Sequence, residues 1–188
     1  IFFAALALSG VFNFFYPAYT GLGALPFHLC NLAIVVMFIA FVFDVKGFFY
    51  FTYFVNVIGA MFAVMLPNLG QDFHALMSVH YWMNHAYDIV IPILGVALKV
   101  FPRPTIKFMG KAIATFTAYF IVVIGINAWF SNYTNVDFFY INSTFFFDHI
   151  NLEPSLMYNY AVTIQHNDLV FRLYPLFYVV VYVSFIGL

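Results

Sequence analysis

The sequence predicts an all-α membrane protein, a polytopic bundle of about six transmembrane helices that forms one domain over residues 1–188. Of its 188 residues, 65% are hydrophobic and only 7% are charged, whereas a soluble domain carries about 25% charged residues. Its long uncharged runs have the length that a bilayer requires. They are about twice as long as the ten-residue strands of a membrane barrel, so helices are expected.

Six apolar runs define the expected helices. They cover about residues 1–15, 25–43, 48–66, 73–98, 106–130 and 169–188. The joints between them, such as "YPAYTGLG", "DVKG" and "FPRP", are rich in proline and glycine, which mark turns. The first and last runs begin or end inside apolar sequence, so we expect both helices to be truncated parts of a longer protein.

Basic side chains lie on one side of the expected bundle. Lys99, Arg103, Lys107 and Lys111 surround the joint at residues 99–111, and a further lysine lies in the joint at 44–47. Short basic loops stay in the cytoplasm, so both joints should face inward. The aromatic stretch at about 131–168 should then lie at the outer interface. The net charge of −1 and the lack of a basic run give no indication of nucleic-acid binding.

Polar side chains inside the apolar runs are the candidates for function. Cys30 is the only cysteine and stands between His28 and Asn31. Counting inward from the expected membrane boundaries places Cys30 and His85 at the same depth, roughly 9 Å below the outer surface. On the helical wheel, Cys30 points away from His28.

A second group of polar residues lies in the run at 73–98. Tyr81, His85 and Asp88 form one stripe at helical spacing, and His80 and Asn84 form a separate pair. A carboxylate at the centre of a membrane helix costs roughly 3 kcal/mol, so a functional role is expected for Asp88. No pair of histidines has metal-ligand spacing, so neither a metal nor another cofactor is expected.

Three stretches in order, "LPFHLCNLA", "LPNLG…SVHYWMNHAYDIVIPIL" and "INAWFSNYTNV", resemble the YwaF-like bacterial integral membrane proteins. These are related to the eukaryotic transmembrane protein 164 family. The resemblance covers the chain from about residue 20 onward, although Ala86 and Ser131 stand where members tend to carry glycine. It implies a protein of the bacterial cytoplasmic membrane. Eukaryotic relatives look like acyltransferases that remodel phospholipids through a cysteine and a histidine, and these roles fall on Cys30 and His85.

The residues and the resemblance together predict thiol-dependent acyl transfer or hydrolysis on phospholipids near the outer leaflet. Cys30 would be the nucleophile, His85 would take its proton across ~3–4 Å, and Asp88 would orient the imidazole. The expected partner is a phospholipid or lysophospholipid. The expected substrate-binding residues are His28, Asn31, His80, Tyr81, Asn127, Asn132 and Tyr133.

Two other functions fit the same composition. A helical bundle with a polar pocket could bind or transport a small solute, which needs no nucleophile. It could also be an accessory subunit of a larger membrane complex. A lateral opening for a lipid chain, a closed aqueous cavity, or a filled core would separate the three possibilities.

Overall fold

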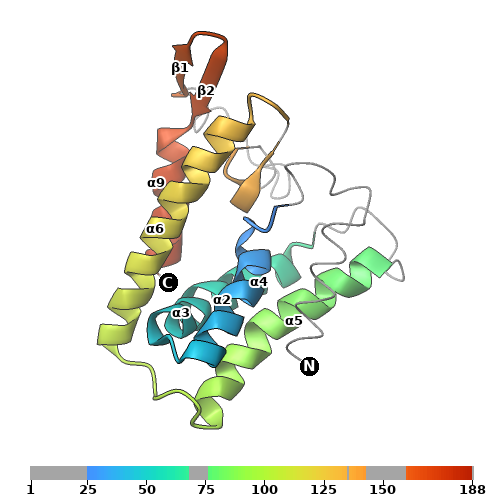
Figure 1. The fold of residues 1–188 in the computed structure, drawn as a ribbon, viewed down its shortest axis with the longest axis vertical. Helices are drawn as coiled ribbons and strands as arrows, with labels where there is room; N and C mark the ends of the chain where they lie inside the picture. The colour runs from blue at the N-terminus through green and yellow to red at the C-terminus, as the bar shows by residue number, and fades with distance from the viewer. Residues whose placement is uncertain (1–24, 68–75, 135, 143–159, 188) are drawn as a thin grey trace.

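A computed structural model describes residues 25–67, 76–134, 136–142 and 160–187 (Figure 1). The expected helix at residues 1–15 lies outside this part of the chain. Helices account for most of the described residues and fall largely within the expected apolar runs, except that one helix begins two residues early, at Lys46, and a short turn at residues 138–140 lies outside them. They are α2 (Leu29–Phe43), α3 (Lys46–Phe51), the π-helical segment η3 (Thr52–Asn56), α4 (Val57–Met65), α5 (Leu76–Ala97), α6 (Ile106–Phe130), the 3₁₀ turn η4 (Phe138–Tyr140) and α9 (Pro175–Ile186).

The first group of helices packs around α2. The chain turns back after α2 at Asp44, which adopts the left-handed conformation with φ 50°. Segments α3, η3 and α4 then run on as one helix that contacts α2, and both α2 and α4 contact α5. The wide turn of η3 is closed by a bond from the backbone N–H of Val57 to the carbonyl of Thr52. Such π-helical turns are often found at functional sites.

An aromatic core holds the basic end of this group. Phe49 of α3 stacks on Phe101 with ring centroids 3.8 Å apart, and the Tyr50 hydroxyl donates to the Pro102 carbonyl at 2.6 Å. Gly95 of α5 makes the close approach possible, because a Cβ there would lie 2.8 Å from the Phe49 ring. The joint between α5 and α6 is thereby fixed against α3.

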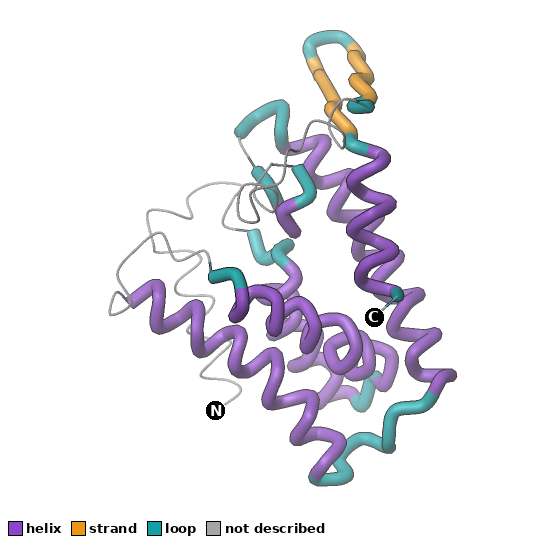
Figure 2. The backbone as a smooth tube through the Cα atoms, turned by 180° about the vertical axis from the view of Figure 1, so that it is seen from behind, coloured by secondary structure: helices purple, strands orange, loops and turns teal. Residues whose placement is uncertain are grey.

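Helices α6 and α9 form a second pair, seen side by side from behind in Figure 2. Their contact is aromatic: Phe116 stacks on Tyr182 with centroids 5.7 Å apart, and Phe120 meets Tyr178 edge to face. The Tyr182 hydroxyl and the Thr117 hydroxyl share a hydrogen bond of 2.6 Å. Helix α6 also packs against α3, which joins the pair to the first group.

A β-hairpin corrects the expectation of an all-α fold. Strands β1 (Val162–His166) and β2 (Leu169–Leu173) pair antiparallel. The alternation of β-branched and polar residues in β1 is typical of a strand, and Asn167 in the turn has φ 54°. The expected last helix therefore begins at Pro175, where proline suits a first helical position, rather than at residue 169.

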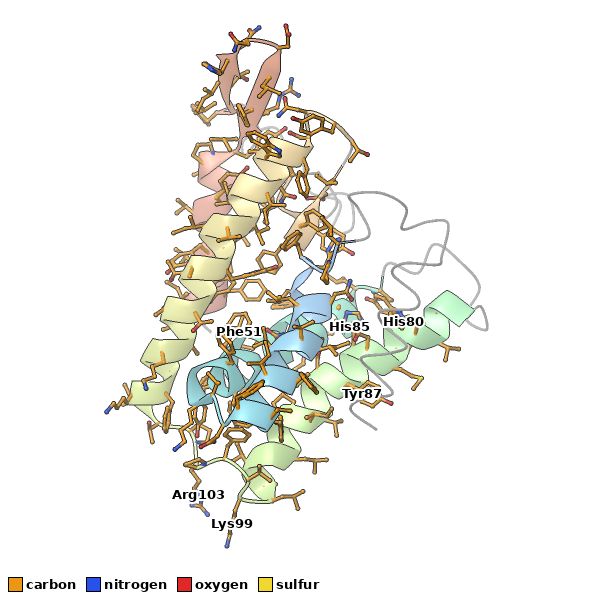
Figure 3. The ribbon with its side chains drawn as sticks, viewed as in Figure 1. Phe51, His80, His85, Tyr87, Lys99 and Arg103 are labelled. Carbon is orange, nitrogen blue, oxygen red and sulfur yellow. The ribbon has the colours of Figure 1, made fainter. Side chains whose placement is uncertain are left out.

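Two helices of the described chain are long and apolar enough to cross a membrane by length and composition. They are the continuous helix Lys46–Met65 and α6, Ile106–Phe130. Helices α2 and α9 are apolar but shorter. The described residues thus form a mostly helical protein with two membrane-length helices, and the count of six remains a prediction. Lys99 and Arg103 lie at the end of the molecule opposite the hairpin (Figure 3).

Candidate functional site

Cys30 lies in the first turn of α2, where a helix has unpaired backbone donors. The first backbone bond at this end runs from Leu32 N–H to the carbonyl of His28, at 2.9 Å. The N-cap His28 makes no side-chain capping bond. The N–H groups of Leu29, Cys30 and Asn31 therefore have no partner within the helix. A helix end of this kind favours negative charge, so it suits a thiolate or an oxyanion.

Asp88 of α5 lies close enough to the Cys30 thiol for an electrostatic interaction. Asp88 is completely buried, whereas Cys30 is partly buried. Neither oxygen of the Asp88 carboxyl has a hydrogen-bond partner in the described part of the chain. A buried carboxyl is normally well paired, so its position beside the only thiol is unusual.

His85 is oriented by the backbone of its own helix and not by Asp88. Its Nδ1 lies 2.7 Å from the carbonyl oxygen of Tyr81. A carbonyl can only accept, so Nδ1 carries the proton, and in the neutral ring Nε2 has a free lone pair. In the described residues no hydrogen bond joins Asp88 to His85, and none joins His85 to Cys30.

The other polar residues of α5 connect it to its neighbours. The side-chain amide of Asn84 donates to the Asn31 side-chain oxygen of α2 at 3.3 Å. The Tyr81 hydroxyl donates to the Ala63 carbonyl of α4 at 2.6 Å. His80 lies close enough to His85 for an electrostatic interaction. Figure 3 shows both histidines on the half of α5 beside α2 and α4.

Sequence reasoning missed two residues beside Cys30. Asn56, in the π-helical segment η3, is fully buried and donates from its side chain to the Leu29 carbonyl at 3.3 Å. Tyr119 of α6 interacts electrostatically with Cys30 and donates its hydroxyl to the Phe27 carbonyl at 2.9 Å. The single asparagine within the apolar run "YFVNVIG" could have indicated Asn56. Nothing in the sequence separates Tyr119 from the other tyrosines.

Aromatic rings cover the N-terminal end of α2. The His28 ring packs against Phe138 and Tyr140, with centroids 5.4 and 5.2 Å apart. The side chain of Asn127 is fully buried and bonds the backbone of Phe138. Of the expected substrate-binding residues, His28 and Asn31 therefore lie at the Cys30 turn itself, and Asn127 supports the rings packed on it.

Asn132 and Tyr133 lie at the far end of α6, next to the hairpin. The Asn132 side-chain oxygen accepts from the Val170 N–H at 2.6 Å, and its amide donates to the Ala128 and Trp129 carbonyls. Tyr133 is exposed. The bonds of Asn132 connect the hairpin to α6, and in the described part of the chain neither residue is hydrogen-bonded to Cys30 or Asp88.

Comparison with known families decides the kinship of the chain. A sequence model of the TMEM164 family matches residues 1–186. The chain belongs to the TMEM164 family. Membership of this family and the two apolar helices together support the assignment of the chain as a membrane protein. Neither the curated proteins nor the solved structures contain a match to it.

Proposed function

We propose that this TMEM164 family member is an integral membrane enzyme that transfers or hydrolyses phospholipid acyl chains through Cys30. The observation that carries the proposal is the placement of the only thiol at the N-terminal turn of α2, beside a buried carboxyl. A structural cysteine needs neither feature, because it usually packs as a small hydrophobe. Acyl transfer needs a nucleophile, a proton acceptor and donors for an oxyanion.

The first turn of α2 supplies the oxyanion donors. When the sulfur attacks an ester carbonyl, the carbonyl oxygen gains negative charge. The unpaired N–H groups of Cys30 and its neighbours point out of the same helix end. Preorganised donors of this kind contribute about 3–4 kcal/mol each to transition-state stabilisation. Tertiary contacts from Asn84 hold the side chain of Asn31 at this turn.

His85 supplies a base for the second half of the reaction. Its Nδ1–H donates a hydrogen bond to the Tyr81 carbonyl, so Nε2 is the nitrogen that can accept a proton. The acyl acceptor, a lysophospholipid hydroxyl or water, has to lose a proton as it attacks the thioester. The described residues contain no cluster of three His, Cys, Asp or Glu side chains able to hold a metal.

The position of the site in the membrane belongs to the same proposal. With the basic α5–α6 joint in the cytoplasm, Cys30 would lie toward the outer leaflet, at the depth of phospholipid ester bonds. The proposal also includes a total of about six transmembrane helices and kinship with the bacterial YwaF-like proteins. It places the protein in a bacterial cytoplasmic membrane. The proposed substrate-binding residues are His28, Asn31, His80, Tyr81, Asn127, Asn132 and Tyr133.

A covalent intermediate gives the sharpest test. Purified protein in vesicles of defined phospholipid is analysed by intact mass, with and without hydroxylamine. We expect a mass increase of one acyl chain that hydroxylamine removes, and no increase in Cys30→Ala. Acyl transfer that survives in Cys30→Ala would disprove the proposal. Bound small solute in place of lipid would favour a transport protein.

A further inference from the structure

We propose that the β1–β2 hairpin lies in the surface layer of the membrane that contains α6, with one apolar face among phospholipid headgroups and upper acyl chains. The partner of this face is therefore a lipid surface. The inference concerns how the protein contacts the bilayer. It is independent of the chemistry at Cys30.

The pairing of the two strands gives the hairpin two different faces. Directly paired residues have side chains on the same face, and successive residues of a strand point to opposite faces. One face, called here the apolar face, consists of the pairs Val162–Leu173, Ile164–Phe171 and His166–Leu169. The other face consists of the pairs Thr163–Arg172 and Gln165–Val170. His166 is the polar member of the apolar face, and it lies next to the turn.

The protein covers only half of the apolar face. The side chains from β2 are half-buried: Phe171 lies with its ring centroid 6.4 Å from that of Trp129, and Leu173 packs against the main core. The side chains from β1 are open, since Val162 is 45% exposed and Ile164 is 51% exposed. The apolar face thus extends beyond the part that α6 covers, and an apolar medium should cover the remainder.

Trp129 indicates the depth of this face in the bilayer. The rise from Lys111 to Trp129 is ~27 Å at 1.5 Å per residue, close to the ~30 Å of a hydrocarbon core. Trp129 and Tyr133 are 50% and 61% exposed, and exposed Trp and Tyr are typical of the membrane boundary. The Ile164–Phe171 pair lies beside Trp129, so we place it at the same boundary.

The hairpin is fixed at the ends of α6 and α9 (Figure 1). The Val170 N–H donates to the side-chain oxygen of Asn132 at 2.6 Å, which attaches β2 to the end of α6. Only Tyr174 separates β2 from α9. These two connections hold the hairpin in one orientation, so the same face is always presented to the bilayer.

The surroundings favour lipid over a protein partner. The helices that carry the hairpin also expose apolar side chains, among them Ile121 of α6 and Val179 of α9. A specific protein interface uses about 20–30 residues a side, whereas the open part of the apolar face offers Val162 and Ile164. None of the paired residues on this face is Asp, Glu, Lys or Arg, so its insertion buries no charge of these residues. Arg172 remains on the face toward water.

Two spin-labelled variants that differ by one position test the proposal. Ile164→Cys and Thr163→Cys each carry a nitroxide label on the full chain in phosphatidylcholine nanodiscs. A Cys30→Ala background removes the only natural cysteine. Both positions are exposed in β1, but their side chains point to opposite faces. Collisions with molecular oxygen, which concentrates in lipid, and with a water-soluble nickel chelate report the surroundings of each label.

We expect the label at 164 to collide more with oxygen and the label at 163 to collide more with the chelate. The ratio of the two collision rates should differ between the positions by about threefold or more, because an interfacial element buries only its apolar face. Val170→Cys is the matched control, since it replaces an exposed apolar residue that is paired with Gln165 on the other face. It should behave as Thr163→Cys does.

Three outcomes would overturn the proposal. Access of the chelate to both 163 and 164 would place the whole hairpin in water, and equal access of oxygen to both would place it within the hydrocarbon. Low access of both reagents to 164 would show that a second copy or another protein covers the apolar face. Size-exclusion profiles confirm that each labelled variant is folded, and Cys30→Ser replaces Cys30→Ala if that background is unfolded. Neither measurement requires acyl transfer, so failure of the proposed function would leave the result unchanged.

Discussion

The side-chain amide of Asn127 forms two hydrogen bonds with the backbone of Phe138. Its Nδ2 donates to the Phe138 carbonyl at 2.8 Å, and its Oδ1 accepts from the Phe138 N–H at 2.9 Å. The next two residues, Phe139 and Tyr140, have φ values of 64° and 52°. Bulky residues rarely adopt this left-handed region. The buried asparagine therefore holds a strained turn whose rings pack on His28.

Replacing Asn127 by leucine should lower stability by about 1–3 kcal/mol for each buried backbone group left unpaired. The leucine has a similar size but can neither donate to nor accept from Phe138. Thermal unfolding in detergent measures the effect. Asn132→Ala provides the comparison, since the bonds of that partly exposed side chain lie at the hairpin end. Equal losses of stability in the two variants would contradict a special contribution from the two hydrogen bonds between Asn127 and Phe138.

Gly95→Ala should destabilise the basic end of the bundle by about 1–3 kcal/mol, because overpacking moves neighbouring rings. The new Cβ would lie 2.8 Å from the Phe49 ring and 3.3 Å from Phe41. Phe49 cannot simply turn away, since it stacks on Phe101. Gly110→Ala in α6 is the control. Nothing lies within 4 Å of its Cβ position, so it should be neutral or gain about 0.5–1 kcal/mol. Chemical denaturation of both variants gives the comparison.

Cysteines placed at Lys107 and at Gln165 should be labelled from opposite sides of the membrane in a Cys30→Ala background. Lys107 is exposed in the basic joint, and Gln165 is exposed in strand β1. A membrane-impermeant maleimide applied to whole cells should reach residue 165 and reach residue 107 only after lysis. Labelling of both from the outside would contradict the proposed orientation, and with it the proposed outer-leaflet position of Cys30.

His85→Asn should leave the fold intact and lower the rate of acyl transfer by about 10²–10⁴-fold. The asparagine amide can still donate to the Tyr81 carbonyl, but it has no basic nitrogen in place of Nε2. Nitrogen NMR of the wild-type ring should show the proton on Nδ1. Tyr81→Phe is the paired variant, since it keeps the carbonyl and loses the bond to Ala63, worth about 1 kcal/mol. A proton found on Nε2 would refute the assigned tautomer.

The positions of the helices were predictable because an apolar run of membrane length can adopt few structures other than a helix. The run expected at 106–130 is helix Ile106–Phe130, and the run at 48–66 is helix Lys46–Met65. The strand at 169–173 was not predictable in the same way. "LVFRL" is apolar and continuous with the next run, so its separation depends on pairing with Val162–His166.

The side-chain partners within the site were less accessible from sequence. Helical spacing placed His85 and Asp88 on one face of α5, and the structure keeps them on one helix. Spacing cannot tell which residue of α2 meets that face, because the contact depends on how the helices cross. It also cannot show that the Tyr81 carbonyl takes the Nδ1 proton of His85. Backbone carbonyls compete with every carboxylate for such donors, and this competition is resolved only in three dimensions.

The π-helical segment Thr52–Asn56 contains one extra residue, and the presence of that residue can be compared among relatives. A π-helical turn holds one residue more than an α-helical turn, and each residue rotates an α-helix by about 100°. A relative shortened by one residue between positions 51 and 57 would have an unbroken α-helix. The wide turn accommodates the extra residue, so the side chains of α4 would keep their orientation, but those within the turn would shift, and the bond from Asn56 to the Leu29 carbonyl would be lost. The length of this stretch, and not its composition, should therefore distinguish family members that share the Cys30 site from those that have only the fold.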